Sequence, residues 1–491
     1  MHIILMSPQP NLTSNHTYLN THIGQESYHA FVEELAIEMA LLGHTVDLVT
    51  RKIDDSIYQD YPAPMAHSKL SNNLRIIQIP TQSTAFVADE AVWEILYEWV
   101  KNVAEYYYPT VESLDFISGH GPIGGLASAL LSEKTNVPYA FTPHSFAKAQ
   151  LDKIEFSSIN MTVIDGLADT AKQLMAERAA MKGASVLFAS TQKEVNNAYL
   201  SHTYKDIITA KKDRLNIVLP GIRPFDAESD TLSRSSEAFH QAIDERLVRD
   251  ITHSRLDLPY MIIPLHFEPY THQLKLLHTY AQSEALRAMT NIVFINQGCP
   301  DIKAMYEKLP MSEKKQVQAI QDVIAANDLD GQVTFMNAQT DPQLTQFLKY
   351  MSALNGFLVL MESPLSFSSM ILKSMHAGLP IAVNEQLNTT SILEENGKLC
   401  GIQFTPAKSD QITKSLMYIL KNYDHCKTQA LNKASDTFSC AYTAQEYIKA
   451  LEWALKNPID REFDIPDYFK SPSDFLDFKL DPLQQFYLTD Y

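Results

Sequence analysis

The chain has 491 residues, of which 45% are hydrophobic and 20% are charged, and this length allows about two or three domains with buried cores. Its formal net charge is −18 at pH 7, and a chain this acidic is a poor candidate for binding the phosphate backbone of nucleic acids. The four cysteines are widely spaced, without the Cys-x-x-Cys pairs of zinc sites, so we expect reduced thiols and no metal ion. No apolar run is long enough for a membrane span, and the first apolar segment is too short for a secretory signal, so we expect a cytoplasmic protein.

Short apolar segments, typical of buried strands, alternate with segments of helical period along the first half of the chain. The predicted strands are Ile3–Met6, Thr45–Thr50, Leu74–Ile79, Asp115–Ser118, Tyr139–Thr142, Val186–Ser190 and Leu215–Leu219. The predicted helices are Gln25–Leu42, Glu90–Tyr108, a segment that contains Leu126–Leu131, Val163–Lys182 and one that begins at Gln192. This order predicts a Rossmann-like parallel sheet with helices on both faces. The first strand–helix–strand unit lacks the G-x-G-x-x-G fingerprint, so we expect no nicotinamide or flavin cofactor.

Polar residues follow several of these strands. His120 follows the fourth strand and His144 the fifth, while Gly24 ends the long loop after the first strand and allows a ligand to approach the next helix closely. Ligands of such folds bind beyond the carboxyl ends of the strands, so these residues are expected to converge there. The alternatives are a structural hydrogen bond for either histidine and an ordinary helix start after Gly24.

A second alternating series follows a polar, charged linker, Arg223–Arg255. Its predicted strands are Tyr260–Leu265, Ile292–Asn296, Val333–Met336, Phe357–Met361, Ile381–Val383 and Ile402–Phe404. Its predicted helices are His272–Ala288, Ile302–Asn327, Pro342–Met351, Ser368–His376 and Asp410–Lys421. The sequence therefore predicts an α/β protein with two Rossmann-like doubly wound domains that face each other across a cleft.

A helix, Thr443–Leu455, and an acidic tail rich in aromatic residues complete the chain. Disordered tails rarely carry so many aromatic side chains, so we expect the tail to pack on the body, with binding to a protein partner as the alternative. The expected division is 1–225 for the first domain, 226–256 for a linker and surface helix, 257–440 for the second domain, and 441–491 for the C-terminal helix and tail.

The stretch Gly356–Pro380 predicts a buried strand, a Ser-rich turn and a short helix that Gly378 ends. The backbone N–H groups and the dipole at such a helix start favour a phosphate group. Candidate ligand-binding residues at this helix start are Ser368, Ser369 and Met370, with Lys373 one turn later.

Several motifs together resemble one enzyme superfamily. They are Gly24–Tyr28, Val46–Arg51, Ser118–His120, Val137–Ser145 and Ser190–Glu194 in the first half, and Phe367 with His376–Pro380 in the second. With these motifs the chain resembles the retaining glycosyltransferases of the GT-B fold, and among them the sucrose synthase and sucrose-phosphate synthase branch, over roughly residues 1–455.

The resemblance implies a hexosyltransferase that binds a nucleotide sugar, a UDP-sugar above all, in a metal-independent cleft. His144 matches a position near the transferred sugar and is the expected catalytic residue. Donor contacts are expected from Gly24, His266, Ser368, Ser369, Met370 and Lys373, and acceptor contacts from Gln25, His120 and Ser145. The acceptor itself is not specified by the resemblance.

The chain departs from the family pattern in the donor-binding half. Leu365 and Lys373 stand where the family has paired glutamates, and His266 and Thr271 stand where it has a cationic pair that offsets the diphosphate charge. Two hypotheses follow: a divergent glycosyltransferase, or a catalytically inactive pseudo-glycosyltransferase that acts as a binding or regulatory subunit. A metal-dependent transferase with Asp328-Leu329-Asp330 as its D-x-D motif is a third, although a surface turn also explains that triplet.

Overall fold

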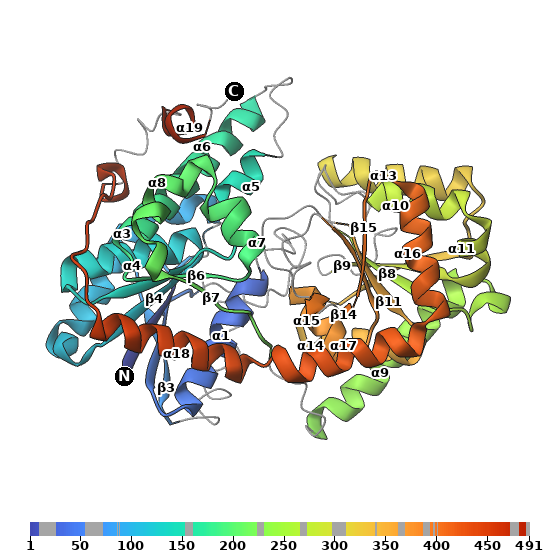
Figure 1. The fold of residues 1–491 in the computed structure, drawn as a ribbon, viewed down its shortest axis with the longest axis horizontal. Coiled ribbons are helices and arrows are strands. Elements are labelled where there is room, and N and C mark those ends of the chain that lie inside the picture. Colours follow the sequence, from blue (N-terminus) through green and yellow to red (C-terminus); the bar gives the residue numbers. More distant parts are fainter. Residues whose placement is uncertain are drawn as a thin grey trace.

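The computed structural model describes residues 1–8, 26–54, 72–85, 87, 89–152, 161–222, 230–265, 273–296, 311–338, 341–361, 369–385, 393–395, 398–399, 401–471 and 481–487. These residues form two α/β units, each built on one parallel sheet (Figure 1). Helix α18 (Cys440–Lys456) runs from the second unit back across the first. The prediction of two doubly wound sheets is thus confirmed.

The first unit contains a seven-stranded sheet in the order β3-β2-β1-β4-β5-β6-β7, with every neighbouring pair parallel. Its strands are β1 (His2–Ser7), β2 (Thr45–Arg51), β3 (Leu74–Ile79), β4 (Phe116–His120), β5 (Tyr139–Thr142), β6 (Val186–Ala189) and β7 (Leu215–Ile217). Its helices are α1 (Glu26–Leu41), α3 (Asp89–Tyr107), α4 (Gly121–Thr135), α5 (Ala147–Leu151), α6 (Met161–Gly183), α7 (Gln192–Glu194) and α8 (His202–Ala210). The strand order reverses between β1 and β4, which is where ligands bind in doubly wound folds.

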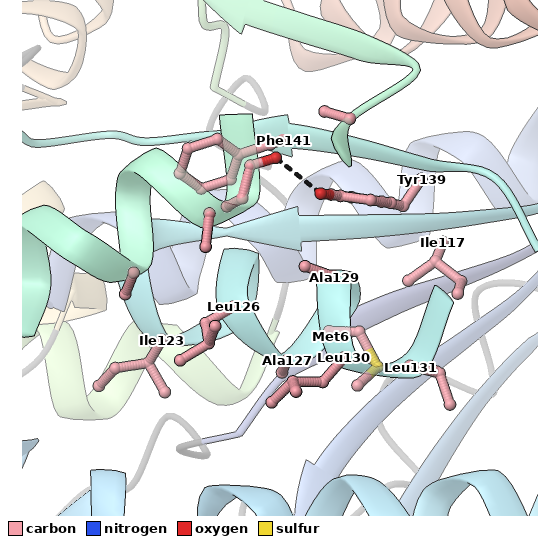
Figure 2. Close-up of a cluster of buried hydrophobic side chains, with 14 of the residues drawn as sticks. Met6, Ile117, Ile123, Leu126, Ala127, Ala129, Leu130, Leu131, Tyr139 and Phe141 are labelled. Carbon is pink, nitrogen blue, oxygen red and sulfur yellow. Dashed lines mark hydrogen bonds between the residues drawn. The ribbon is translucent and has the colours of Figure 1, made fainter. Parts of the chain in front are cut away.

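Alternating side chains divide this sheet into two faces. One face packs on α3, α4 and α6: Figure 2 shows Tyr139 and Phe141 of β5 beside α4, with the Tyr139 hydroxyl donating to the Ala180 carbonyl oxygen at 2.8 Å. The other face packs on α1 and α18. Residues two apart on a strand share a face, and neighbouring residues lie on opposite faces. Ile117, Tyr139 and Phe141 occupy the face that packs on α3, α4 and α6. His120 and Thr142 therefore lie on the face covered by α1 and α18.

The second unit contains a six-stranded parallel sheet in the order β10-β9-β8-β11-β12-β15. Its strands are β8 (Tyr260–Pro264), β9 (Asn291–Asn296), β10 (Val333–Asn337), β11 (Phe357–Leu360), β12 (Ile381–Asn384) and β15 (Ile402–Phe404), and a small hairpin pairs β13 (Glu394–Glu395) with β14 (Lys398–Leu399). Its helices are α9 (Asp230–Asp250), α10 (Gln273–Gln282), α11 (Glu284–Met289), α13 (Met311–Ala326), α14 (Asp341–Ala353), α15 (Ser369–His376), α16 (Ser409–Lys421) and α17 (Tyr423–Thr437). Separate apolar clusters cover its two faces.

The chain crosses twice between the units, and the two crossings lie together. The Ile222 amide donates to the Phe438 carbonyl oxygen at 3.0 Å, and the Cys440 amide donates to the Ile222 carbonyl oxygen at 3.1 Å. A Cβ atom on Gly221 would lie 2.3 Å from the backbone of Ser439, so only glycine permits this approach. The paired crossings make a compact connection between the two units.

The tail packs on the first unit, as predicted. The Arg461 guanidinium donates to the Asn136 carbonyl and side-chain oxygens, at 2.6 and 2.5 Å, and to the Val137 carbonyl oxygen at 2.6 Å. Phe469 is buried, with its ring centroid 5.8 Å from that of Trp93. The short helix α19 (Asp481–Phe486) rests on α6 and α8.

Two predicted elements differ from the structure, and one helix of the second unit was not predicted. β4 extends to His120, because Gly119 lets the strand pack against α4: a Cβ there would lie 2.7 Å from the Gly124 carbonyl oxygen. The predicted helix His272–Ala288 divides into α10 and α11, because Ser283 caps the second helix by accepting the Leu286 amide. Helix α17 was not predicted. None of the helices that the structure describes is both long and apolar enough to cross a membrane.

Candidate functional site

The carboxyl edge of the first sheet brings His120 and His144 into contact. His120 Nδ1 lies 2.9 Å from His144 Nε2, and His120 Nε2 lies 2.9 Å from Ser118 Oγ. Ser118 and His120 are each 1% exposed, whereas His144 is half-buried. Burial lowers the pKa of His120 to about 3, so this imidazole is neutral at physiological pH. The convergence expected for the two histidines is confirmed.

Aromatic side chains surround the two histidines. The Tyr28 ring of α1 stacks on His144 at a centroid distance of 5.4 Å, and Phe31, one helical turn later, meets His144 edge-on at 5.2 Å. The ring centroids of Tyr447 of α18 and His120 lie 6.4 Å apart, and the Tyr447 hydroxyl forms a hydrogen bond with Thr142 Oγ1 at 3.1 Å. Side chains of the first helix and of the last helix thus pack around the same pair of histidines.

The register of the sheet explains the pair. His120 of β4 lies opposite Thr142 of β5, so His144 lies two residues beyond this register position. His144 has a φ of +60°, a left-handed conformation that turns the chain after β5. Ser145, predicted as an acceptor contact, is exposed, and its amide donates to the Pro143 carbonyl oxygen at 2.7 Å.

A buried carboxyl group holds the chain just after His144. Glu177 of α6 accepts the Ala147 amide at 3.0 Å and also accepts the Tyr204 hydroxyl. Burial raises the pKa of Glu177 to about 8, although both donors act in the opposite direction. Sequence reasoning missed Glu177, because a glutamate within a long helix gives no signal of burial.

The motif Ser190–Glu194 is a helix start. Thr191 caps α7 by accepting the Glu194 amide at 3.1 Å, and Glu194 reaches back to accept the amide of Ser190, the residue before the cap, at 3.2 Å; this arrangement resembles a capping box. Burial raises the pKa of Glu194 to about 8. The Ser190–Glu194 motif therefore serves to begin helix α7.

Another matched motif, Val46–Arg51, also holds the fold. Asp47 is buried within β2 and forms an ion pair with Arg75 at 2.6 Å. Burial alone would raise the pKa of Asp47, but hydrogen bonds from Arg75, Tyr107 and His2 lower it. Arg51 is buried at the end of the strand and donates to the Ala85 carbonyl oxygen at 2.9 Å.

The two units meet at the carboxyl edges of their sheets. Lys193, which follows β6, donates to the Glu385 carbonyl oxygen, which follows β12, at 2.7 Å. Burial lowers the pKa of Lys193, and the Glu385 carboxylate acts in the opposite direction. The sequence placed Lys193 in a motif but gave no sign of this contact.

On the second unit, α15 begins at Ser369, as the sequence predicted within one residue. Met370 is half-buried and packs against the core, and Lys373, on the same helix, is 8% exposed. The remaining predicted site residues, Gly24, Gln25, His266 and Ser368, lie outside the described residues, as do the departures at Thr271 and Leu365.

The triplet Asp328–Asp330 is a turn between α13 and β10. Asp328 has a φ of +51° and is exposed, while Leu329 is buried between the two acidic residues. The triplet precedes β10, so it lies at the amino end of the strand, opposite to the edge where the two units meet. This position favours a surface turn.

No family model matches the sequence. The chain is 23% identical to a probable sucrose-phosphate synthase of Thermosipho melanesiensis over 461 residues, which are 92% of this chain and 96% of that protein. The solved sucrose-phosphate synthase of Thermosynechococcus elongatus aligns at a TM-score of 0.65 and 15% identity, over 93% of this chain and 100% of that one. The Anabaena protein HepE, solved in complex with UDP and glucose, aligns at a TM-score of 0.57 and 13% identity, over 92% of this chain and 100% of that one.

The structural alignments establish the fold, and the full-length sequence similarity indicates the branch. Two parallel sheets joined by a double crossing, with a last helix that returns to the first unit, fit both findings. The chain therefore has the GT-B fold and is a homologue of the GT-B glycosyltransferases, related to their sucrose-phosphate synthase branch.

Proposed function

We propose that the protein is a metal-independent glycosyltransferase that takes a hexosyl group from a UDP-sugar and transfers it to an acceptor hydroxyl. In this reaction the bond between the anomeric carbon and the diphosphate breaks, a bond to the acceptor oxygen forms, and the acceptor proton leaves. The observation that carries the proposal is the 2.7 Å contact between Lys193 and Glu385, because it sets the carboxyl edges of the two sheets face to face. The complex of HepE with UDP and glucose supports a uridine nucleotide as the donor's leaving group.

The donor side of the proposed site is the start of α15. Backbone N–H groups at Ser369 and Met370 and the dipole of this eight-residue helix suit a diphosphate. Lys373 is the first basic residue of this helix; it lies in the last turn and is buried. In the proposal, Ser368, His266 and Gly24 complete the donor contacts.

The acceptor side is the edge of the first sheet. His144 is half-buried and is the proposed contact to the transferred sugar, with Ser145 exposed beside it. His120 is buried, so its proposed contribution passes through its hydrogen bond to His144. Gln25, just before α1, is the remaining proposed acceptor contact.

A pseudo-glycosyltransferase that binds a ligand without turnover is the second candidate. The observation that favours it is Lys373, which stands where the family resemblance expects a carboxylate and lies buried against the core rather than open to solvent. Such a subunit would keep the first-unit pocket while its second unit has lost the charges that stabilise a leaving diphosphate.

Calorimetry with a panel of nucleotide sugars, followed by assays for release of free nucleotide, tests the proposal. We expect UDP-sugars to bind and, with a suitable sugar or sugar-phosphate acceptor, to release UDP. His144→Ala should lower the rate of release by about 100-fold or more, whereas His425→Ala, at an exposed position on α17, should not change it. Binding without release would favour the pseudoenzyme, and no binding to any donor at millimolar concentration would refute the proposed function.

We also propose a cytoplasmic location. The proposed domain boundaries follow residues 225, 256 and 440. Cys426 and Cys440 are both buried and form no disulfide within the described residues, which suits a reducing compartment. A disulfide between cysteines of the purified, unreduced protein, detected by mass spectrometry, would contradict that location.

A further inference from the structure

A continuous chain of three polar side chains crosses the edge of the first sheet. It runs from Ser118 Oγ to His120 Nε2, and from His120 Nδ1 to His144 Nε2, with 2.9 Å at each step. Two of its three members are almost completely buried, so water does not replace these partners. Each step therefore requires one proton from one of the two atoms that it joins.

The proton count allows only two arrangements. A neutral imidazole carries a single N–H, and His120 is neutral because burial lowers its pKa to about 3. His120 therefore donates on one side and accepts on the other. Either the protons all point from Ser118 towards His144, or they all point from His144 towards Ser118.

The surroundings of Ser118 decide between these directions. Within the part of the chain that the structure describes, the single hydrogen bond of the Ser118 hydroxyl is the one to His120. If Ser118 accepted a hydrogen bond from His120, the hydroxyl proton of Ser118 would be buried without an acceptor, which is costly. If Ser118 donates instead, its hydroxyl proton has His120 Nε2 as acceptor and the His120 proton has His144 Nε2 as acceptor.

We propose that Ser118 and His120 are positioning residues that fix the tautomer of His144, which carries its ring proton on Nδ1. His120 Nδ1–H then donates to His144 Nε2, so His144 acts towards a bound group as a hydrogen-bond donor and not as a base. Its Nδ1–H suits the oxygen of a sugar hydroxyl or a phosphate. This role towards a sugar rests on the proposed function, whereas the tautomer itself does not.

The packing around His144 supports a fixed ring. Its backbone has a φ of +60°, which a side chain adopts only where its surroundings enforce it. Tyr28 stacks on the ring at an interplanar angle of 23°, and Phe31 meets it at 68°, so two directions are blocked. A ring held in this way keeps one orientation, so each of its nitrogen atoms keeps the same surroundings.

Long-range ¹H–¹⁵N correlation NMR of the labelled full chain tests the proposal without any substrate. The probe is the protonation of each ring nitrogen of His120 and His144, whose signals are assigned with His120→Asn and His144→Ala. We expect both rings to carry the proton on Nδ1, in at least about ten-fold excess over the other tautomer. A wild-type spectrum with His144 protonated on Nε2 would overturn the inference.

A matched pair of variants tests the part played by Ser118. Ser118→Thr keeps the hydroxyl and should keep the wild-type tautomers, whereas Ser118→Ala should bring the two His144 tautomers to within about three-fold of each other, because the directing proton is gone. An unchanged His144 tautomer in Ser118→Ala would remove Ser118 from the mechanism. Because these spectra are recorded without a nucleotide sugar, a failure of the proposed glycosyl transfer leaves them unchanged and is detected separately.

Discussion

Replacing Glu177 with glutamine should make the first unit less sensitive to alkaline pH. Glu177 accepts hydrogen bonds from the Ala147 amide and the Tyr204 hydroxyl inside the protein, and burial raises its pKa from an ordinary value of 4.5 to about 8. Between these two values the folded protein holds a proton that the unfolded chain has released. The stabilising contribution of the protonated form is therefore complete below pH 4.5 and is lost as the pH rises to 8.

The size of the effect follows from the two pKa values. Each pH unit between them corresponds to about 1.36 kcal/mol, so the free energy of unfolding falls by about 5 kcal/mol over this range through Glu177 alone. Glutamine has nearly the same shape and keeps one oxygen acceptor but does not titrate. Glu177→Gln should thus abolish this part of the pH dependence, while Glu194, whose pKa burial also raises to about 8, still contributes its own part in both proteins.

Urea unfolding followed by tryptophan fluorescence at several pH values between 5 and 9 measures this difference. Trp93 and Trp99 lie in α3, and Trp453 lies in α18 over the same unit, so the signal reports on the unit that contains Glu177. Glu105→Gln, at an exposed position on α3, is the matched control and should follow the wild type. If Glu177→Gln lost stability with rising pH as steeply as the wild type, the reasoning from burial would be wrong.

Two further contacts yield predictions. Lys193→Ala removes the hydrogen bond to the Glu385 carbonyl oxygen between the units, worth about 1 kcal/mol, so small-angle scattering should show a larger radius of gyration. Lys212→Ala, at an exposed position of the first unit, should leave the radius of gyration unchanged. Equal radii for the two variants would contradict a role of Lys193 in holding the units together. Arg461→Ala removes the hydrogen bonds that tie the tail to Asn136 and its neighbours, about 3 kcal/mol in all, so limited proteolysis should cleave the tail at least ten-fold faster. Arg461→Lys should give intermediate rates because it keeps the charge without the planar fork, and cleavage of all three proteins at one rate would refute the anchoring role.

The sequence predicted the strands well because most are short apolar runs that are buried on both faces. β5, which is buried throughout, agrees with its predicted limits residue by residue. β3 and β15 agree as well, although they are only partly buried. The sequence also predicted that His120 and His144 lie close together, because the carboxyl ends of neighbouring parallel strands share one edge of the sheet. β4 was predicted too short because a Gly-His-Gly run is typical of a turn, and only the packing of Gly119 against α4 shows why it continues as a strand.

The parts of the site that the sequence did not predict depend on contacts between distant segments. Tyr447 lies 305 residues after Thr142, its hydrogen-bond partner, and no local pattern links the two. The contact of Lys193 with Glu385 spans 192 residues and joins a side chain to a backbone oxygen, which any residue supplies. Glu177 resembles any polar position of a long helix. Periodicity locates elements, whereas these contacts arise only when the elements are assembled.

The two sides of the proposed site differ in the polar groups that they offer to a ligand. On the first unit, Ser118, His120 and His144 form a hydrogen-bonded series in which the buried groups have partners, so these side chains are organised before any ligand arrives. On the second unit, the family resemblance implies that the residues expected to offset a diphosphate are replaced. The start of α15 is then the proposed phosphate contact, where a helix dipole contributes about 0.3–1 kcal/mol for an exposed charge. That contribution corresponds to less than ten-fold in affinity. Under the proposed function, the specificity of the protein therefore lies mainly in the sugar-facing pocket of the first unit, and differences in affinity across the donor panel should follow the sugar more than the nucleotide.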